Sequence, residues 1–160
     1  MIRAYVALGA NLGDPRATIS AALTALADIA ATAVVARSSL YQTAPVGLKH
    51  QPDFINAVAA VDTALTPLAL LEALFALEAR FGRSRSLPNA PRTLDLDLLL
   101  HGDTLVVGAR LTLPHPRLHE RAFVLAPLAE IAPCCEIPGR GSVTDLLEGC
   151  RDQRIVRLAS

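Results

Sequence analysis

The chain has 160 residues, of which 52% are hydrophobic, and its formal net charge is zero. This length predicts a single domain, and the charge balance excludes the strongly basic surface of a general nucleic-acid binder. No apolar run approaches the ~20 residues of a membrane-spanning helix, and the odd count of three cysteines excludes a complete disulfide framework.

The first half of the chain alternates strand and helix patterns. Residues 2–8 predict a strand that ends at Gly9, and Asp14 before Pro15 predicts the start of a helix over residues 15–30. Residues 33–42 and 54–62 are rich in strand-forming residues and predict two further strands. The prolines and glycine between them predict a long loop.

The second half continues with a helix, a long loop and a strand. Thr66 before Pro67 predicts the start of the second helix, and Gly82 ends it. After the loop, residues 94–100 predict a fourth strand, and Gly102 turns the chain into a hairpin. Further on, we expect a helix over 117–131, a capped short helix after Ser142 and a closing strand over 155–158.

The order of the first four strands and two helices predicts the fold class. The order β-α-β-β-α-β is that of the ferredoxin-like pattern, in which helices cover one face of the sheet. We therefore expect one compact α+β domain over residues 1–160, with a ferredoxin-like core, an added hairpin and C-terminal helices. The fold alone specifies no function.

The fourth strand carries the sharpest chemical signal. Alternate side chains of a strand share a face, so Leu94, Leu96, Leu98 and Leu100 are expected to face the helices. Asp95 and Asp97 then share the other face, with α-carbons ~6.6 Å apart. Such a pair suits Mg²⁺, which takes one or two carboxylates and leaves its other positions to water and phosphates. The alternative is a polar strand face in solvent.

Arginines precede this strand. Arg83, Arg85 and Arg92 lie in the loop before it. Phosphoryl transfer combines a metal on some phosphate oxygens with rigid arginine donors on others, which favours a site for a nucleotide. The alternative is that these arginines only pair with the aspartates. The motif Gly-x-x-x-x-Gly-Lys-Ser/Thr is absent, which excludes a P-loop kinase.

Other residues are weaker candidates. Glu78 interrupts an apolar helix face, either beside an arginine or nucleotide or because the helix end reaches solvent. His115, between two prolines, either donates a hydrogen bond to a phosphate or is a turn histidine. Phe54 and Asn56 share a strand face that suits a flat heterocycle, with Phe123 as a second ring. The alternative for these aromatic residues is the core.

Several motifs resemble one enzyme family over essentially the whole chain: GANLGD, TAPVG, QPDFINAV, APRTLDLDLLLHG and LTLPHPRLHERAFVLAPLAEIAP. The family is the 6-hydroxymethyl-7,8-dihydropterin pyrophosphokinases of folate biosynthesis. The resemblance implies that the pterin hydroxymethyl oxygen attacks the β-phosphorus of ATP, giving AMP and the pterin diphosphate. It also implies a monomer that binds these small molecules and no nucleic acid or membrane. The cysteine content favours a reducing, cytoplasmic compartment.

The resemblance also implies residue roles. Asp95 and Asp97 would hold two Mg²⁺ ions, and Arg83, Arg92 and His115 would be catalytic. The ATP site would comprise Glu78, Arg83, Arg92, Leu98, Arg110, Leu111, Thr112, His115 and Arg121. The pterin pocket would comprise Thr43, Val46, Phe54, Asn56 and Phe123. The chain departs from the family pattern at Phe75, Asn89 and Pro116, where glutamine, tryptophan and tyrosine are common.

Two other functions remain open from the residues themselves. A magnesium-dependent nucleotide hydrolase would use the same acidic strand with water as the acceptor. A non-enzymatic ferredoxin-like module, for example one that binds RNA, would show sheet aromatics among basic residues. The aspartates of the fourth strand would repel phosphates in the absence of a metal.

Overall fold

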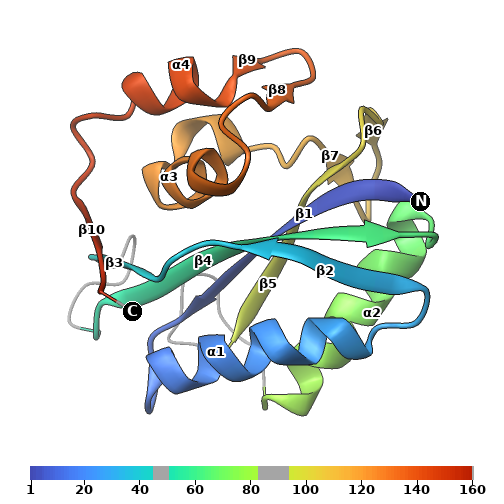
Figure 1. The fold of residues 1–160 in the computed structure, drawn as a ribbon, viewed down its shortest axis with the longest axis horizontal. Helices are drawn as coiled ribbons and strands as arrows, with labels where there is room; N and C mark the ends of the chain where they lie inside the picture. Colours follow the sequence, from blue (N-terminus) through green and yellow to red (C-terminus); the bar gives the residue numbers. More distant parts are fainter. Residues whose placement is uncertain (45–50, 83–93, 160) are drawn as a thin grey trace.

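A computed structural model describes residues 1–44, 51–82 and 94–159, in which an antiparallel sheet forms the centre (Figure 1). The strand order is β10-β3-β4-β1-β5, and β2 also pairs with β4. The strands are β1 (Ile2–Ala10), β2 (Thr32–Arg37), β3 (Tyr41–Thr43), β4 (Phe54–Thr63), β5 (Asp95–His101) and β10 (Ile155–Arg157). Strand β1 therefore continues through Gly9, where the sequence predicted its end.

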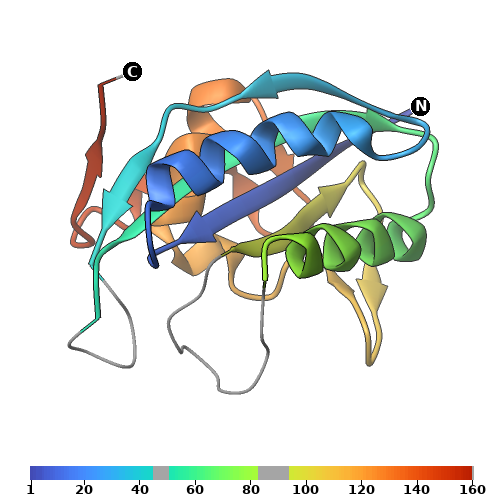
Figure 2. The same cartoon turned by 90° about the horizontal axis from the view of Figure 1, so that it is seen from below.

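Helices cover both faces of the sheet (Figures 1 and 2). On one face lie α1 (Pro15–Ala25), extended by the 3₁₀ helix η1 (Leu26–Asp28), and α2 (Pro67–Arg80). On the other lie α3 (Ala122–Ile131), preceded by the 3₁₀ helix η2 (Leu118–Glu120), and α4 (Val143–Glu148). The expected single α+β domain is confirmed. None of the described helices is long and apolar enough to cross a membrane.

Side-chain caps explain where three helices begin. Asp14 accepts a hydrogen bond from the Ala17 amide at 3.2 Å, and Thr66 accepts one from the Ala69 amide at 3.2 Å. Ser142 caps α4 by accepting from the Asp145 amide at 3.1 Å. Each cap satisfies a backbone donor that has no partner within the first helical turn. These three predicted helix starts are confirmed.

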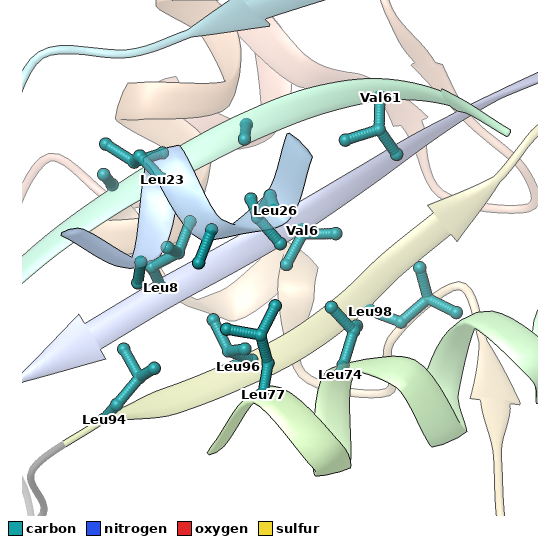
Figure 3. Packing of buried hydrophobic residues seen from close by; sticks show 14 of the residues in the cluster. Val6, Leu8, Leu23, Leu26, Val61, Leu74, Leu77, Leu94, Leu96 and Leu98 are labelled. Atoms are coloured by element: carbon teal, nitrogen blue, oxygen red, sulfur yellow. The ribbon is translucent and has the colours of Figure 1, made fainter. Parts of the chain in front are cut away.

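The face covered by α1 and α2 buries a continuous aliphatic core. Leu94, Leu96 and Leu98 meet Leu74 and Leu77 of α2 there (Figure 3). Alternate residues of β1 face the same core and are almost completely buried, namely Ala4, Val6, Leu8 and Ala10. The period-two alternation of these strands therefore directs Asp95 and Asp97 to the opposite face, as predicted.

The alternation breaks near the end of β5, where the prediction for Leu100 is wrong. Val6 pairs with Leu98 and Tyr5 with Leu100, so β5 has one extra residue, Leu99, at a register shift. An extra residue in one strand reverses the faces of the residues beyond it. Leu99 and Leu100 consequently pack into the second core, on the side of α3.

Three other elements differ from the prediction. Residues 33–42 divide into β2 and β3, because the Ser38 side chain and backbone both bond the backbone of Val58 at 2.9 Å. The hairpin after Gly102 pairs β6 (Val106–Val107) with β7 (Thr112–Leu113) rather than with the fourth strand. The helix expected from residue 117 starts at Ala122. A further hairpin pairs β8 (Glu136–Ile137) with β9 (Gly141–Ser142).

Candidate active site

The floor of the candidate site crosses the sheet on the face of α3. Gly9 of β1 pairs with Asn56 of β4 on one side and with Asp95 of β5 on the other, and Ala7 pairs with Asp97. A side chain at Gly9 would place its Cβ 3.2 Å from the Asn56 Oδ1. Such a Cβ would crowd the amide, so Gly9 keeps the floor open between amide and carboxylate. A glycine within a strand pattern was the available signal, and sequence reasoning missed it.

A cleft of about 520 Å³ opens above this floor, and the start of α3 forms its other wall. It brings together four of the five residues expected around the pterin with both aspartates and two expected nucleotide contacts. These residues are Thr43, Phe54, Asn56, Phe123, Asp95, Asp97, His115 and Arg121. The fifth expected pterin residue, Val46, lies outside the described residues. Both aromatic rings and charged side chains therefore line the first cleft.

The Asn56 amide is held in place inside this cleft. Asn56 is 6% exposed, and its Nδ2 donates a hydrogen bond to the Thr43 Oγ1 at 2.8 Å. Thr43 pairs with Phe54 across the ladder between β3 and β4, so ring, hydroxyl and amide form one patch. The amide retains acceptor and donor capacity, which suits the edge of a planar heterocycle.

A second cleft of about 260 Å³ adjoins the first, and five of the nine expected nucleotide residues line it. Its lining includes Leu98, Arg110, Leu111 and Thr112, and also Phe75 and Pro116. Asp97 and His115 line both clefts. A ligand that extends from the second cleft into the first must pass these two side chains.

Asp95 and Asp97 fit the needs of Mg²⁺. In the parts of the chain that the structure describes, no three His, Cys, Asp or Glu side chains are grouped as a metal cage. A pair of half-buried carboxylates beside open space is nevertheless the donor set that Mg²⁺ takes when water and phosphate complete its coordination. Zinc sites in proteins are built mainly from Cys sulfur and His nitrogen, so a pair of carboxylates suits Mg²⁺ better than Zn²⁺.

Two arginines, Arg117 and Arg121, line the first cleft together with the carboxylates. Burial lowers the pKa of Arg121, as does the nearby Arg117, while Asp97 and Asp95 act in the opposite direction. The Arg121 guanidinium lies 5.4 Å from the centre of the Phe123 ring. The cleft can thus accept a polyanion together with a cation on the aspartates, because positive and negative groups line one cavity.

His115 is held as a neutral hydrogen-bond donor. Burial, followed by Arg121, lowers its pKa to about 4, although Asp95 raises it and Arg117 lowers it further. The Nδ1 accepts a hydrogen bond from the Arg117 amide at 3.2 Å, so the proton of the neutral ring is on Nε2. An Nε2–H at the junction of the two clefts can donate a hydrogen bond to a phosphate oxygen.

The protonation of His115 gives a direct test by NMR. In the ligand-free protein, its ring signal should titrate near pH 4 rather than the ordinary 6.5. Because the unfolded chain takes up this proton first, the free energy of unfolding should fall as the pH is lowered from 6.5 towards 4. The His115→Asn variant assigns the signal and should lose this part of the pH dependence. A titration midpoint near pH 6.5 in the folded protein would contradict the lowered pKa of His115.

Glu78 lies in the interior, and the alternative of a solvent-exposed helix end is wrong. It is 1% exposed, and its Oε2 accepts a hydrogen bond from the Leu96 amide at 2.8 Å. Leu96 stands between Asp95 and Asp97, so α2 anchors the strand that presents both carboxylates. Glu78 lines neither cleft, and its expected place near the nucleotide stays a prediction.

The remaining expected residues divide into two groups. Arg110 forms an exposed ion pair with Glu72 at the rim of the second cleft. Arg83 and Arg92 lie outside the described residues. Sequence reasoning missed three polar residues that line the first cleft, Arg117, Glu120 and Gln153. Arg117 and Glu120 lie within the quoted motif LTLPHPRLHERAFVLAPLAEIAP but were given no role, whereas no motif marks Gln153.

Comparisons with known proteins identify the family of the chain. The family model described as 7,8-dihydro-6-hydroxymethylpterin-pyrophosphokinase (HPPK) matches residues 5–133. A 2-amino-4-hydroxy-6-hydroxymethyldihydropteridine pyrophosphokinase of Pseudomonas aeruginosa is 49% identical, over 98% of this chain and 96% of the relative. The Haemophilus influenzae protein of the same name is 42% identical over 99% of both chains. A crystal structure of Plasmodium falciparum HPPK-DHPS with pteroate has a similar fold, with a TM-score of 0.73 at 13% identity over 92% of this chain and 42% of the longer one.

Proposed function

Because the chain belongs to the 7,8-dihydro-6-hydroxymethylpterin-pyrophosphokinase family, we propose that its two adjoining clefts divide the family reaction between them. The protein is a pyrophosphokinase of folate biosynthesis. It transfers the pyrophosphoryl group of ATP to the hydroxymethyl group of 6-hydroxymethyl-7,8-dihydropterin, and AMP and the pterin diphosphate are the products. Its substrates are therefore two small molecules.

The proposed arrangement places each substrate in one cleft. The pterin lies in the first cleft between Phe54 and Phe123, with its edge on the Asn56 amide. The adenosine part of ATP lies in the second cleft beside Leu98 and Leu111, and Thr112 and Arg110 are close to it. The observation that carries this proposal is that the two clefts share Asp97 and His115. The triphosphate would pass this junction, which would place its β-phosphorus towards the pterin hydroxyl.

We further propose that the reaction depends on Mg²⁺, with two ions held by Asp95 and Asp97. When bound, the metal supplies positive charge that neutralises the phosphate oxygens during transfer. Asp95 and Asp97 project from one strand face, so one rigid element positions both carboxylates. Titration with Mn²⁺ in the presence of an ATP analogue would count the ions by electron paramagnetic resonance.

The other proposed roles concern orientation and charge. The Nε2–H of His115 would donate to a phosphate oxygen, and the Arg121 guanidinium would contact the nucleotide on the side of the first cleft. Arg83 and Arg92, outside the described residues, are proposed to stabilise negative charge that develops in the transition state. No covalent enzyme intermediate is needed, because positioning and electrostatic stabilisation suffice for phosphoryl transfer.

A product assay tests the reaction and the metal together. The protein is mixed with ATP, magnesium and 6-hydroxymethyl-7,8-dihydropterin, and chromatography measures AMP and pterin diphosphate. We expect equal amounts of both products, no AMP without pterin, and loss of both when a chelator is added. AMP formation that is independent of pterin would instead indicate a nucleotide hydrolase. Absence of product would favour a binding module.

The topology of the core, the oligomeric state and the cellular compartment are also proposals. The antiparallel order β5-β1-β4-β3, with β2 beside β4, supports the interpretation of the core as ferredoxin-like. A monomer is expected, and sedimentation equilibrium would test it. The free cysteines Cys134, Cys135 and Cys150 agree with a reducing compartment such as the cytoplasm.

A further inference from the structure

The Gln153 side chain holds the start of helix α3. Its Oε1 accepts a hydrogen bond from the Ala122 amide at 2.9 Å, and its Nε2 donates one to the Glu120 carbonyl at 2.6 Å. Arg121, the residue before the helix, provides no side-chain cap. The C-terminal segment therefore satisfies one of the backbone donors that the first helical turn leaves without a partner.

The two peptide groups that Gln153 binds lie on either side of Arg121, and Phe123 is two residues further along the chain. Arg121 and Phe123 line the first cleft, as does Gln153 itself. The guanidinium of Arg121 lies over the Phe123 ring, so a shift of the backbone would move both groups. Gln153 thus fixes the wall of the cleft that α3 provides.

The same C-terminal segment also joins the opposite wall. Two residues after Gln153, β10 begins, and Ile155 pairs with Thr43 of β3. Thr43 in turn pairs with Phe54 and accepts the hydrogen bond of Asn56. Residues 153–157 therefore connect the wall that carries Phe123 with the wall that carries Phe54.

A second connection between the same elements lies further from the cleft. Glu130 of α3 accepts hydrogen bonds from the Ser39 amide at 3.0 Å, the Tyr41 hydroxyl at 2.7 Å and the Arg157 guanidinium at 3.2 Å. With that end of α3 fixed to β3 and β10, the Gln153 contact determines where the first turn of α3 stands. These contacts then fix the distance between the two walls at Phe54 and Phe123.

We propose that Gln153 is a positioning residue that sets the spacing between Phe54 and Phe123 and thereby the affinity for the pterin. This inference rests on the proposed pterin pocket between these two rings. A flat ring gains its stacking energy only at a narrow range of separations, so a small displacement of one wall weakens binding. Gln153 does not line the second cleft, which includes Leu98 and Leu111, so we expect the shape of that cleft to change less.

The test replaces Gln153 by methionine, which has a similar length but cannot form the two hydrogen bonds. Gln153 is exposed, so the Gln153→Met variant should fold. Titration calorimetry measures the Kd of 6-hydroxymethyl-7,8-dihydropterin with a saturating non-hydrolysable ATP analogue, and the Kd of the analogue alone. We expect the pterin Kd to rise about tenfold and the analogue Kd to rise by a clearly smaller factor, because Arg121 is the one proposed nucleotide contact that adjoins the peptide groups bound by Gln153.

Two further variants separate positioning from stability and from the pocket itself. Val143→Ala removes packing from the buried face of α4 and should lower the melting temperature with the pterin Kd unchanged. Phe123→Ala removes one proposed stacking ring and should weaken pterin binding whether or not Gln153 positions the wall. An unchanged pterin Kd in Gln153→Met, with weak binding in Phe123→Ala, overturns the role of Gln153 alone. Normal binding by Phe123→Ala overturns the pocket and the inference with it.

Discussion

Asp97→Asn is expected to lower kcat at least about a thousandfold while the protein remains folded. Asp97 lines both clefts, so its carboxylate stands where the triphosphate and its metal are proposed to pass. Asparagine keeps the size of the side chain but removes the negative charge that holds a divalent cation. Strand β5 retains its pairing with β1 and the hydrogen bond from the Leu96 amide to Glu78.

The measurement is the rate of pterin diphosphate formation over a range of magnesium concentrations, with circular dichroism to verify the fold. Asp103→Asn is the matched control, because this aspartate follows the same strand but is exposed in the turn after it. The control should retain normal turnover. Near-normal turnover of Asp97→Asn at low magnesium would remove this carboxylate from the metal site.

Asn56→Ala is expected to raise the Kd of the pterin about 30- to 100-fold, with a smaller effect on the nucleotide. The amide is almost completely buried, and the hydrogen bond to Thr43 fixes its orientation beside Gly9. A heterocycle that reads this amide loses paired hydrogen bonds in a water-poor pocket, where an unpaired polar group costs about 1–3 kcal/mol.

Thr43→Val is the matched variant for this prediction. Valine has nearly the same shape but cannot accept the hydrogen bond, so the amide remains in the pocket without the bond that fixes its orientation. We expect an increase in the pterin Kd of only about threefold to tenfold, because a typical hydrogen bond contributes about 0.5–1.5 kcal/mol. Titration calorimetry would measure both variants at saturating nucleotide analogue. Equal and small effects would show that the pterin edge lies elsewhere.

The agreement between expectation and structure is best where neighbouring residues decide the outcome. The caps at Asp14, Thr66 and Ser142 start their helices as predicted, because a cap requires only residues within one turn. The opposite faces of Leu96 and Asp97 follow from the strand period in the same way. Leu100 departs from that period, because the extra residue in β5 depends on pairing with Tyr5, a distant part of the chain.

The candidate site shows the same division. The sequence marked Asp95, Asp97, Asn56 and His115 as chemically unusual. It did not indicate that Gly9 opens the floor, because that role depends on the distance from its backbone to a side chain of another strand. The burial of Glu78 against the Leu96 amide likewise depends on how α2 docks on β5.

Local sequence was enough to predict the main strands and helices, the starts of α1, α2 and α4, the shared face of the two aspartates and, by resemblance, the family. The meeting of two clefts at Asp97 and His115, lined by residues proposed to bind pterin and nucleotide, follows from the tertiary structure. The tertiary structure also decided that Gln153 holds the start of α3. The difference lies in the sequence separation of the interacting residues. Periodicity and capping depend on residues a few positions apart, whereas a cleft depends on register and packing between segments far apart in the chain.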